Sequence, residues 1–195
     1  DTFRFRATHL LAQAVLLDGW RAEDAFRVGE SLPDEDLALI AGGSSERVSW
    51  RVLYEYAMVL QRRGKLEEAL QAASSVFEKE PNFGSAAFRA AEICTQLGKK
   101  EEANLWYRKF LASKDRPLAM DGWAQLQLGE LDLAQNRFQK AVDQDPKNRW
   151  AWQGLGEVAH RRGDTRHEIQ ALEQLLHLDP QNTALAARLA ALKTK

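Results

Sequence analysis

The sequence predicts an all-α protein, built as a solenoid of antiparallel helix hairpins with about four repeats. Three observations support this fold class: glycines at a near-constant interval, prolines that keep the same register, and apolar residues that recur at matching depths. The glycines are Gly64, Gly98, Gly129 and Gly163, which are 34, 31 and 34 residues apart. A period of this length is typical of helical-repeat arrays.

The first three glycines open near-copies of one phrase: Gly-Lys-Leu-Glu-Glu-Ala at Gly64, Gly-Lys-Lys-Glu-Glu-Ala at Gly98 and Gly-Glu-Leu-Asp-Leu-Ala at Gly129. Each copy interrupts a helical pattern. A residue without Cβ adopts a positive φ at little cost, so each glycine is predicted to form the turn of a helix hairpin.

Prolines indicate where each hairpin ends. Pro81, Pro146 and Pro180 each lie 17 residues after a hairpin glycine, where a helix must stop before the next one begins. The resulting register places the repeats near residues 50–83, 84–114, 115–148 and 149–182. It aligns Ala69, Ala103 and Ala134, whose small side chains allow the two helices of a hairpin to approach closely.

Further elements are expected at both ends of this array, which spans residues 46–195 with its final helix. Residues 1–45 are interpreted as a degenerate helical pair followed by a linker that contains Gly42 and Gly43. Residues 183–193 are predicted to form one helix that caps the exposed face of the last repeat.

These residues resemble the tetratricopeptide repeat family, whose pattern is W-x2-L-G-x2-Y followed by Ala, Phe and Pro. The fourth repeat carries Trp152, Leu155, Gly156 and Pro180; the third carries Gly122, Ala134, Phe138, Ala141 and Pro146. The resemblance covers residues 50 to about 180. It implies a right-handed superhelix that binds proteins.

Two repeats depart from the family pattern. The fourth has Glu168 where a small residue is expected and Ala159 in place of the aromatic residue. The second is three residues short, with Asp115 at the proline position and Pro117 just beyond it.

Composition excludes several classes of function. The net charge of −1, with 28% charged residues, provides no basic surface for nucleic acid. No apolar stretch is long enough to span a bilayer. The single Cys94 lies on the apolar side of a predicted helix and is interpreted as a buried thiol. Cytoplasmic and periplasmic locations are both compatible with it. Because the chain starts at Asp1, residues before it are expected to have been removed or left out.

The first helices of stacked hairpins line the concave side of such an array, so their outward positions predict a partner-binding groove. This predicted groove contains large apolar or aromatic residues where a purely solvated surface would carry charge. Its arginines are expected to contact carboxylates of a ligand. The predicted residues are Arg51, Tyr54, Met58, Phe88, Arg89, Arg116, Met120, Trp123, Trp150 and Glu157.

The alternative interpretation is structural. Trp123 and Trp150 would then pack between adjacent first helices, and Phe88 and Tyr54 would also belong to the core. Gly154 on this face indicates close approach by a ligand or a neighbouring helix, or it has no functional meaning. The lysine and asparagine clamp that some family members use for C-terminal carboxylates is lacking.

Catalytic, metal and cofactor sites find no support. The four histidines share no metal-ligand spacing, and the Glu67-Glu68 and Glu101-Glu102 pairs begin helices, where acidic residues favour the helix dipole. The preferred hypothesis is a non-enzymatic adaptor whose groove binds a peptide or helix of a partner protein during complex assembly. The alternatives are the protein-binding region of a larger enzyme and a homo-oligomeric scaffold.

Overall fold

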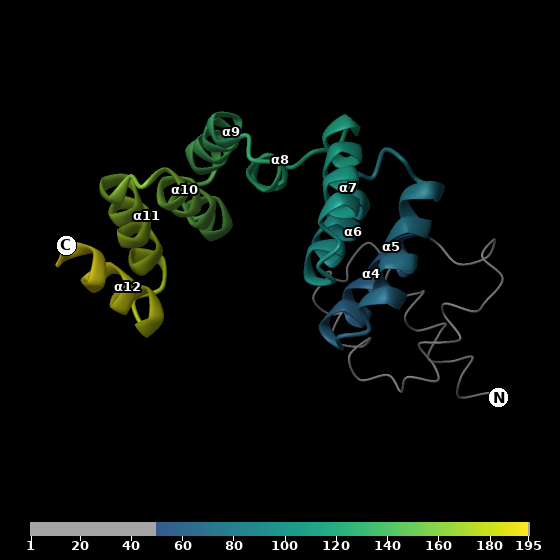
Figure 1. Cartoon of the computed structure of the whole chain (residues 1–195), viewed down its shortest axis with the longest axis horizontal. Coiled ribbons are helices and arrows are strands. Elements are labelled where there is room, and N and C mark those ends of the chain that lie inside the picture. The colour runs from purple at the N-terminus through teal and green to yellow at the C-terminus, as the bar shows by residue number, and fades with distance from the viewer. Residues whose placement is uncertain (1–49, 195) are drawn as a thin grey trace. The chain divides into compact units, whose positions relative to one another are not determined.

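The computed structural model describes residues 50–194, and all regular secondary structure in this part of the chain is helical (Figure 1). The helical pair expected in residues 1–45 lies outside the described residues. The described helices are α4 (Trp50–Arg62), α5 (Leu66–Lys79), α6 (Gly84–Gln96), α7 (Lys100–Ala112), α8 (Leu118–Gln127), α9 (Leu131–Gln144), α10 (Arg149–Arg162), α11 (Thr165–Leu178) and α12 (Thr183–Lys193).

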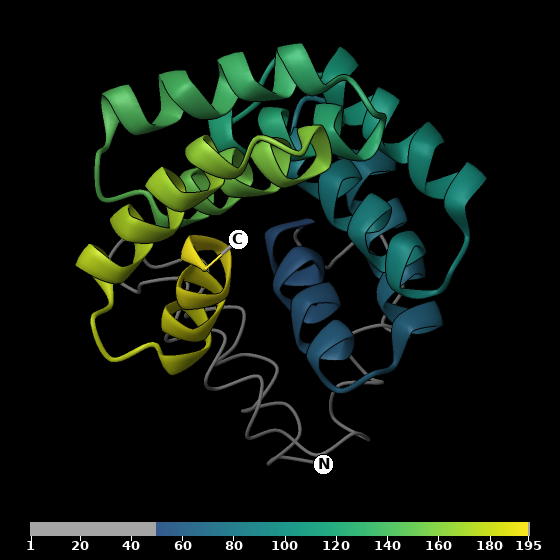
Figure 2. The same cartoon turned by 60° about the vertical axis from the view of Figure 1, so that its left-hand side comes forward.

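The chain divides after Asp115 into two compact units, and each is described by itself. In unit 1, α4 pairs with α5 and α6 pairs with α7. In unit 2, α8 pairs with α9, α10 pairs with α11, and α12 lies against α11 (Figure 2). The predicted all-α array of helix hairpins is confirmed.

The four hairpin turns are built as the glycine spacing predicts. Gly64, Gly98, Gly129 and Gly163 have φ values of 74°, 73°, 83° and 70°. After each glycine, the next backbone N–H donates to a carbonyl five residues back, as Lys65 does to Leu60 at 3.0 Å and Asp164 does to Ala159 at 2.9 Å. This is the Schellman arrangement, which satisfies the last carbonyls of the first helix and requires a left-handed residue.

The short second repeat ends differently from the others. Its second helix, α7, stops at Ala112, and the following turn packs over the start of α6. A Cβ on Gly84 would lie 2.1 Å from the Ser113 Oγ and 2.5 Å from the Asp115 carbonyl oxygen. Glycine at residue 84 therefore makes room for the turn that closes unit 1.

Phe138 on α9 is the centre of the core of unit 2. Its side chain is fully buried, and it lies where two other helices carry glycine. A Cβ on Gly122 of α8 would lie 2.7 Å from the Phe138 ring, and one on Gly154 of α10 would lie 2.3 Å from it. The unusual glycine at residue 154 thus accommodates a side chain of a neighbouring helix.

Glu168 on α11 explains one departure from the repeat pattern. Its carboxylate is buried and accepts hydrogen bonds from Arg188 on α12, from Nε at 3.0 Å and from Nη2 at 2.6 Å. His160 Nδ1 of α10 lies 3.2 Å from its other oxygen. The acidic residue at this position therefore ties the terminal helix to the last hairpin.

Among the described helices, none combines the length and the apolar character needed to cross a membrane.

The glycine at residue 154 can be tested by substitution with alanine. We expect Gly154→Ala to lower the free energy of unfolding by about 1–3 kcal/mol, because the added methyl group overlaps the Phe138 ring. This loss outweighs the roughly 0.5–1 kcal/mol that alanine ordinarily gains over glycine within a helix. Guanidinium unfolding followed by circular dichroism measures the change.

Gly156→Ala is the matched control on the same helix. A Cβ there would lie 3.4 Å from the Ala171 Cβ, an ordinary van der Waals distance. We expect it to be neutral or stabilising. Equal effects of the two substitutions would contradict the proposed packing.

The Glu168–Arg188 pair is tested by a double-mutant cycle. Arg188→Ala removes both guanidinium bonds from a buried carboxylate and is expected to lower the unfolding free energy by about 1–3 kcal/mol. Adding Glu168→Ala removes that carboxylate and should restore most of the loss, as measured by chemical unfolding. A double variant no more stable than Arg188→Ala would show that the pair does not hold α12.

Candidate functional site

The first-helix face of unit 1 carries Tyr54 and Met58 on α4, both half-buried. The Tyr54 ring packs edge-on against Phe83, with ring centroids 4.9 Å apart. Arg51 lies on the same helix, but its side chain is not among those described. Tyr54 therefore contributes both to the core of unit 1 and to its surface.

Arg89 on α6 forms a polar network with residues of its own unit. Its Nη1 donates to the Glu92 carboxylate at 2.9 Å and to the Gln61 amide oxygen at 3.3 Å. Burial raises the pKa of Glu92 and of Glu55 above the ordinary value, and the charge of Arg89 opposes that rise. The guanidinium expected to meet a ligand carboxylate is thus already bonded to a carboxylate of the chain.

Phe88 does not lie on the surface, and the prediction that it faces the groove is wrong. Its side chain is 2% exposed. Its ring packs against Tyr107 and Phe110 of α7, with centroid distances of 5.7 and 5.3 Å. The ring points toward the second helix of its own hairpin, so Phe88 belongs to the core of unit 1.

Trp123 on α8 and Trp150 on α10 form the central feature of the first-helix face of unit 2. Their rings are stacked, with centroids 6.0 Å apart and planes 25° apart. The Trp123 indole Nε1 donates to the Trp150 carbonyl oxygen at 3.3 Å, and its ring meets Phe138 edge-on at 5.5 Å. Both residues are half-buried, so the pair joins two first helices and also presents an aromatic surface.

The charged residues predicted for this face are paired within the chain. Arg116 lies 3.9 Å from the buried carboxylate of Asp121. Glu157 accepts from Arg161 Nε at 2.9 Å. Met120 on α8 is half-buried. The uncharged groups of this face are chiefly the two tryptophans and Met120.

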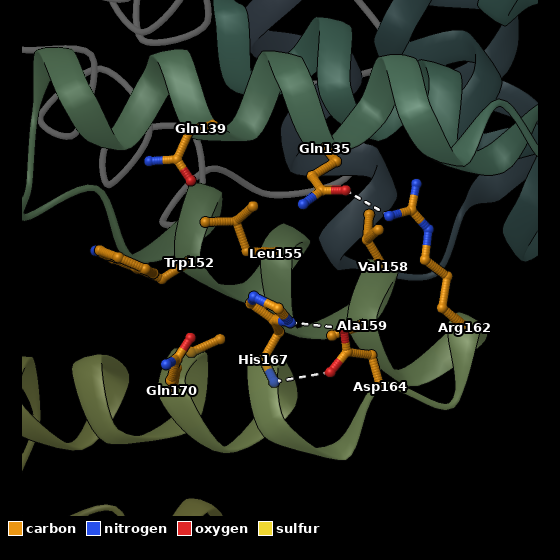
Figure 3. Close-up of a pocket in the computed structure, with 11 residues that line it drawn as sticks. Gln135, Gln139, Trp152, Leu155, Val158, Ala159, Arg162, Asp164, His167 and Gln170 are labelled. Carbon is orange, nitrogen blue, oxygen red and sulfur yellow. Dashed lines mark hydrogen bonds and ion pairs between the residues drawn. The ribbon is translucent and has the colours of Figure 1, made fainter.

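A separate pocket lies in unit 2 between the second helices α9 and α11, above α10 (Figure 3). Its volume is about 90 Å³. Leu155, Val158, Ala159 and Ala171 supply apolar surface, and Trp152 lies at one end. The remaining lining residues are polar: Gln135, Gln139, Arg162, Asp164, His167 and Gln170.

The repeat pattern of the sequence does not predict this pocket. The spacing of Gln135 and Gln139 places both on one side of α9, and that pattern is the one signal in the sequence. That Gln170 lines the same pocket depends on tertiary structure, because α9 and α11 lie on either side of α10. Within residues 50–194, no group of three or more His, Cys, Asp or Glu residues is placed to hold a metal ion.

Cys94 is buried, as predicted, and forms no disulfide. Burial raises the pKa of its thiol to about 11, so little thiolate is present at neutral pH.

A family model described as tetratricopeptide repeat matches residues 54–117 and 120–183. A peroxisomal targeting signal receptor of Komagataella phaffii (strain GS115 / ATCC 20864) is 46% identical over 63 residues, which are 32% of this chain and 10% of the receptor. The chain thus spans about a tenth of the length of the curated relatives that it matches.

Solved structures share the fold. TTC0263 of Thermus thermophilus, described as a thermophilic TPR protein, has a TM-score of 0.66 and 17% identity, with 98% of this chain and 100% of that chain covered. YrrB, described as a TPR protein with an unusual peptide-binding site, has a TM-score of 0.55 and 17% identity, with 80% and 81% covered. At these identities the likeness is one of fold.

The core position of Phe88 leads to a prediction. Phe88→Ala is expected to lower the free energy of unfolding of unit 1 by about 3–5 kcal/mol, because it removes a ring packed against two other aromatic rings. Leu105→Ala on α7, where the side chain is 58% exposed, is the control and should be nearly neutral. Thermal unfolding monitored by circular dichroism compares the two variants. A Phe88→Ala variant as stable as the control would contradict the core position of Phe88.

Proposed function

Because this chain belongs to the tetratricopeptide repeat family, we propose that it is an adaptor that binds a peptide or helix of a partner protein on its first-helix faces. The family fold is a protein-interaction fold and is generally non-enzymatic. The observation that carries the proposal is the stacked, half-buried pair Trp123 and Trp150. Complex assembly is the role that this kind of binding serves.

The physical basis is preorganisation. Trp123 is held by Phe138 behind it, by the Trp150 ring beside it and by its own hydrogen bond. A partner that covers the exposed parts of these rings gains a large desolvated area while little side-chain freedom is lost. Tryptophan is enriched among the residues that dominate binding energy for this reason.

The bound segment is expected to present an apolar or aromatic residue to this face. Arg116 and Glu157 are already paired with Asp121 and Arg161, so no isolated charge from these residues is available to select an ionic group. Met120 next to the tryptophans adds an unbranched side chain that adapts to irregular apolar shapes. The peptide-binding site named for YrrB supports this kind of use of the fold.

Selection of peptides from a displayed random library against the whole chain tests the proposal. We expect the selected peptides to share a large apolar residue. Met120→Ala and Trp150→Ala should each weaken binding by about tenfold or more, measured by fluorescence anisotropy of a labelled peptide. Circular dichroism checks that each variant is folded.

Leu133→Ala is the matched control, because it removes a 54% exposed side chain from α9, a second helix of the same unit. Its affinity should equal that of the unmodified chain. Loss of binding in the Leu133 variant, with the two first-helix variants unaffected, would place the peptide on another surface and refute the assignment.

A further inference from the structure

The pocket between α9 and α11 shares no lining residue with the predicted groove. It combines an apolar floor with a rim of hydrogen-bonding side chains from two different helices. In Figure 3, Gln139 on α9 and Gln170 on α11 approach the floor from opposite sides. A ligand of this pocket must therefore match both the apolar floor and the polar rim.

The charged side chains around the pocket are hydrogen-bonded within the chain. Arg162 donates to the Gln135 amide oxygen and to the Asp132 carboxylate. Asp164 accepts from the backbone N–H of His167 at 3.1 Å, and its other oxygen lies 2.6 Å from Nδ1 of the same residue. Arg162 and Asp164 thus already have hydrogen-bond partners, which disfavours an ionic ligand because its charge would lose water and would have to compete with these bonds.

Neutral hydrogen-bonding capacity is left over. Gln139 uses its Nε2 to donate to Asp143 at 2.8 Å, which leaves its amide oxygen as an acceptor. Gln170 lines the pocket from the facing helix with both an acceptor and two donors. These groups match the N–H and C=O of a peptide bond. An extended segment has such groups free, whereas a helix has already paired all but its terminal ones.

The floor selects by size and polarity. Leu155, Val158, Ala159 and Ala171 line it, and the Trp152 indole borders one end, with its Nε1 bonded to the Pro146 carbonyl oxygen at 2.9 Å. The pocket is small, with a volume of about 90 Å³. That space accommodates one branched aliphatic side chain.

We propose that this pocket is a second peptide-binding site, which takes one leucine-like side chain of an extended, uncharged partner segment while Gln139 and Gln170 bond its backbone. The site goes beyond the first-helix face and does not depend on it. Two sites in unit 2 with no residue in common would let one partner engage both, or let two segments bind at once.

Nuclear magnetic resonance on the whole chain tests the site with the capped tripeptide acetyl-Ala-Leu-Ala-amide. We expect saturable shifts of the Trp152 indole N–H and of the Leu155 and Val158 methyl groups. Acetyl-Ala-Asp-Ala-amide and acetyl-Ala-Lys-Ala-amide should bind at least about tenfold more weakly. Absence of saturation with the leucine peptide, or equal binding of the charged peptides, would overturn the proposal.

Paired glutamine variants give the second measurement. Gln139→Ala with Gln170→Ala should weaken the leucine peptide by about tenfold, since two neutral hydrogen bonds are lost. Gln144→Ala with Gln174→Ala is the matched control, because both residues are exposed on the same two helices and neither lines the pocket. Equal weakening by both pairs would reject the assigned contacts.

The resonance experiment distinguishes the pocket proposal from the first-helix proposal. Shifts confined to Trp123 and Trp150 would overturn the pocket site and leave the first-helix face supported. Shifts confined to Trp152, Leu155 and Val158 support the pocket whether or not Trp150→Ala affects the selected peptides.

Discussion

Unit 2 depends on the packing of the Phe138 ring against Gly122 and Gly154. The ring occupies the space that two Cβ atoms would fill, so α8 and α10 both approach α9 closely. That approach also places Trp123 beside Trp150 and sets α10 as the floor between α9 and α11. The aromatic face and the pocket therefore share one packing constraint, and both use α10, although they have no residue in common. Cores at native density transmit such constraints because they leave little free volume.

Intrachain pairing of charge is the second common feature of the proposed binding surfaces. Arg89 bonds Glu92, Arg161 bonds Glu157, and Arg162 bonds Asp132. Partly exposed pairs of this kind contribute only about 0–1 kcal/mol each to stability. In the two proposed sites, the same pairs leave apolar rings and neutral amides as the main groups that would contact a ligand.

Both departures from the repeat pattern have structural counterparts. Glu168 replaces a small residue at the position where Arg188 of α12 reaches the last hairpin, so a buried carboxylate is compensated by a guanidinium. The short second repeat ends in a turn over Gly84, next to the division between the two units at Asp115. One departure thus lies at the contact with the terminal helix, and the other lies at the end of unit 1.

The sequence by itself determined the hairpins and their register. A positive φ at Gly64, Gly98, Gly129 and Gly163, and helix termination before proline, are local constraints that a single stretch of chain must satisfy. It also identified Trp123 and Trp150 as the aromatic residues of adjacent first helices. Tertiary structure alone decided that Phe88 is core and that Arg89 is already paired. It also decided that Gly154 faces Phe138 and that Gln139 and Gln170 line one pocket from opposite sides. Each of these contacts depends on how different helices pack together. The spacing of residues along the chain does not specify that packing.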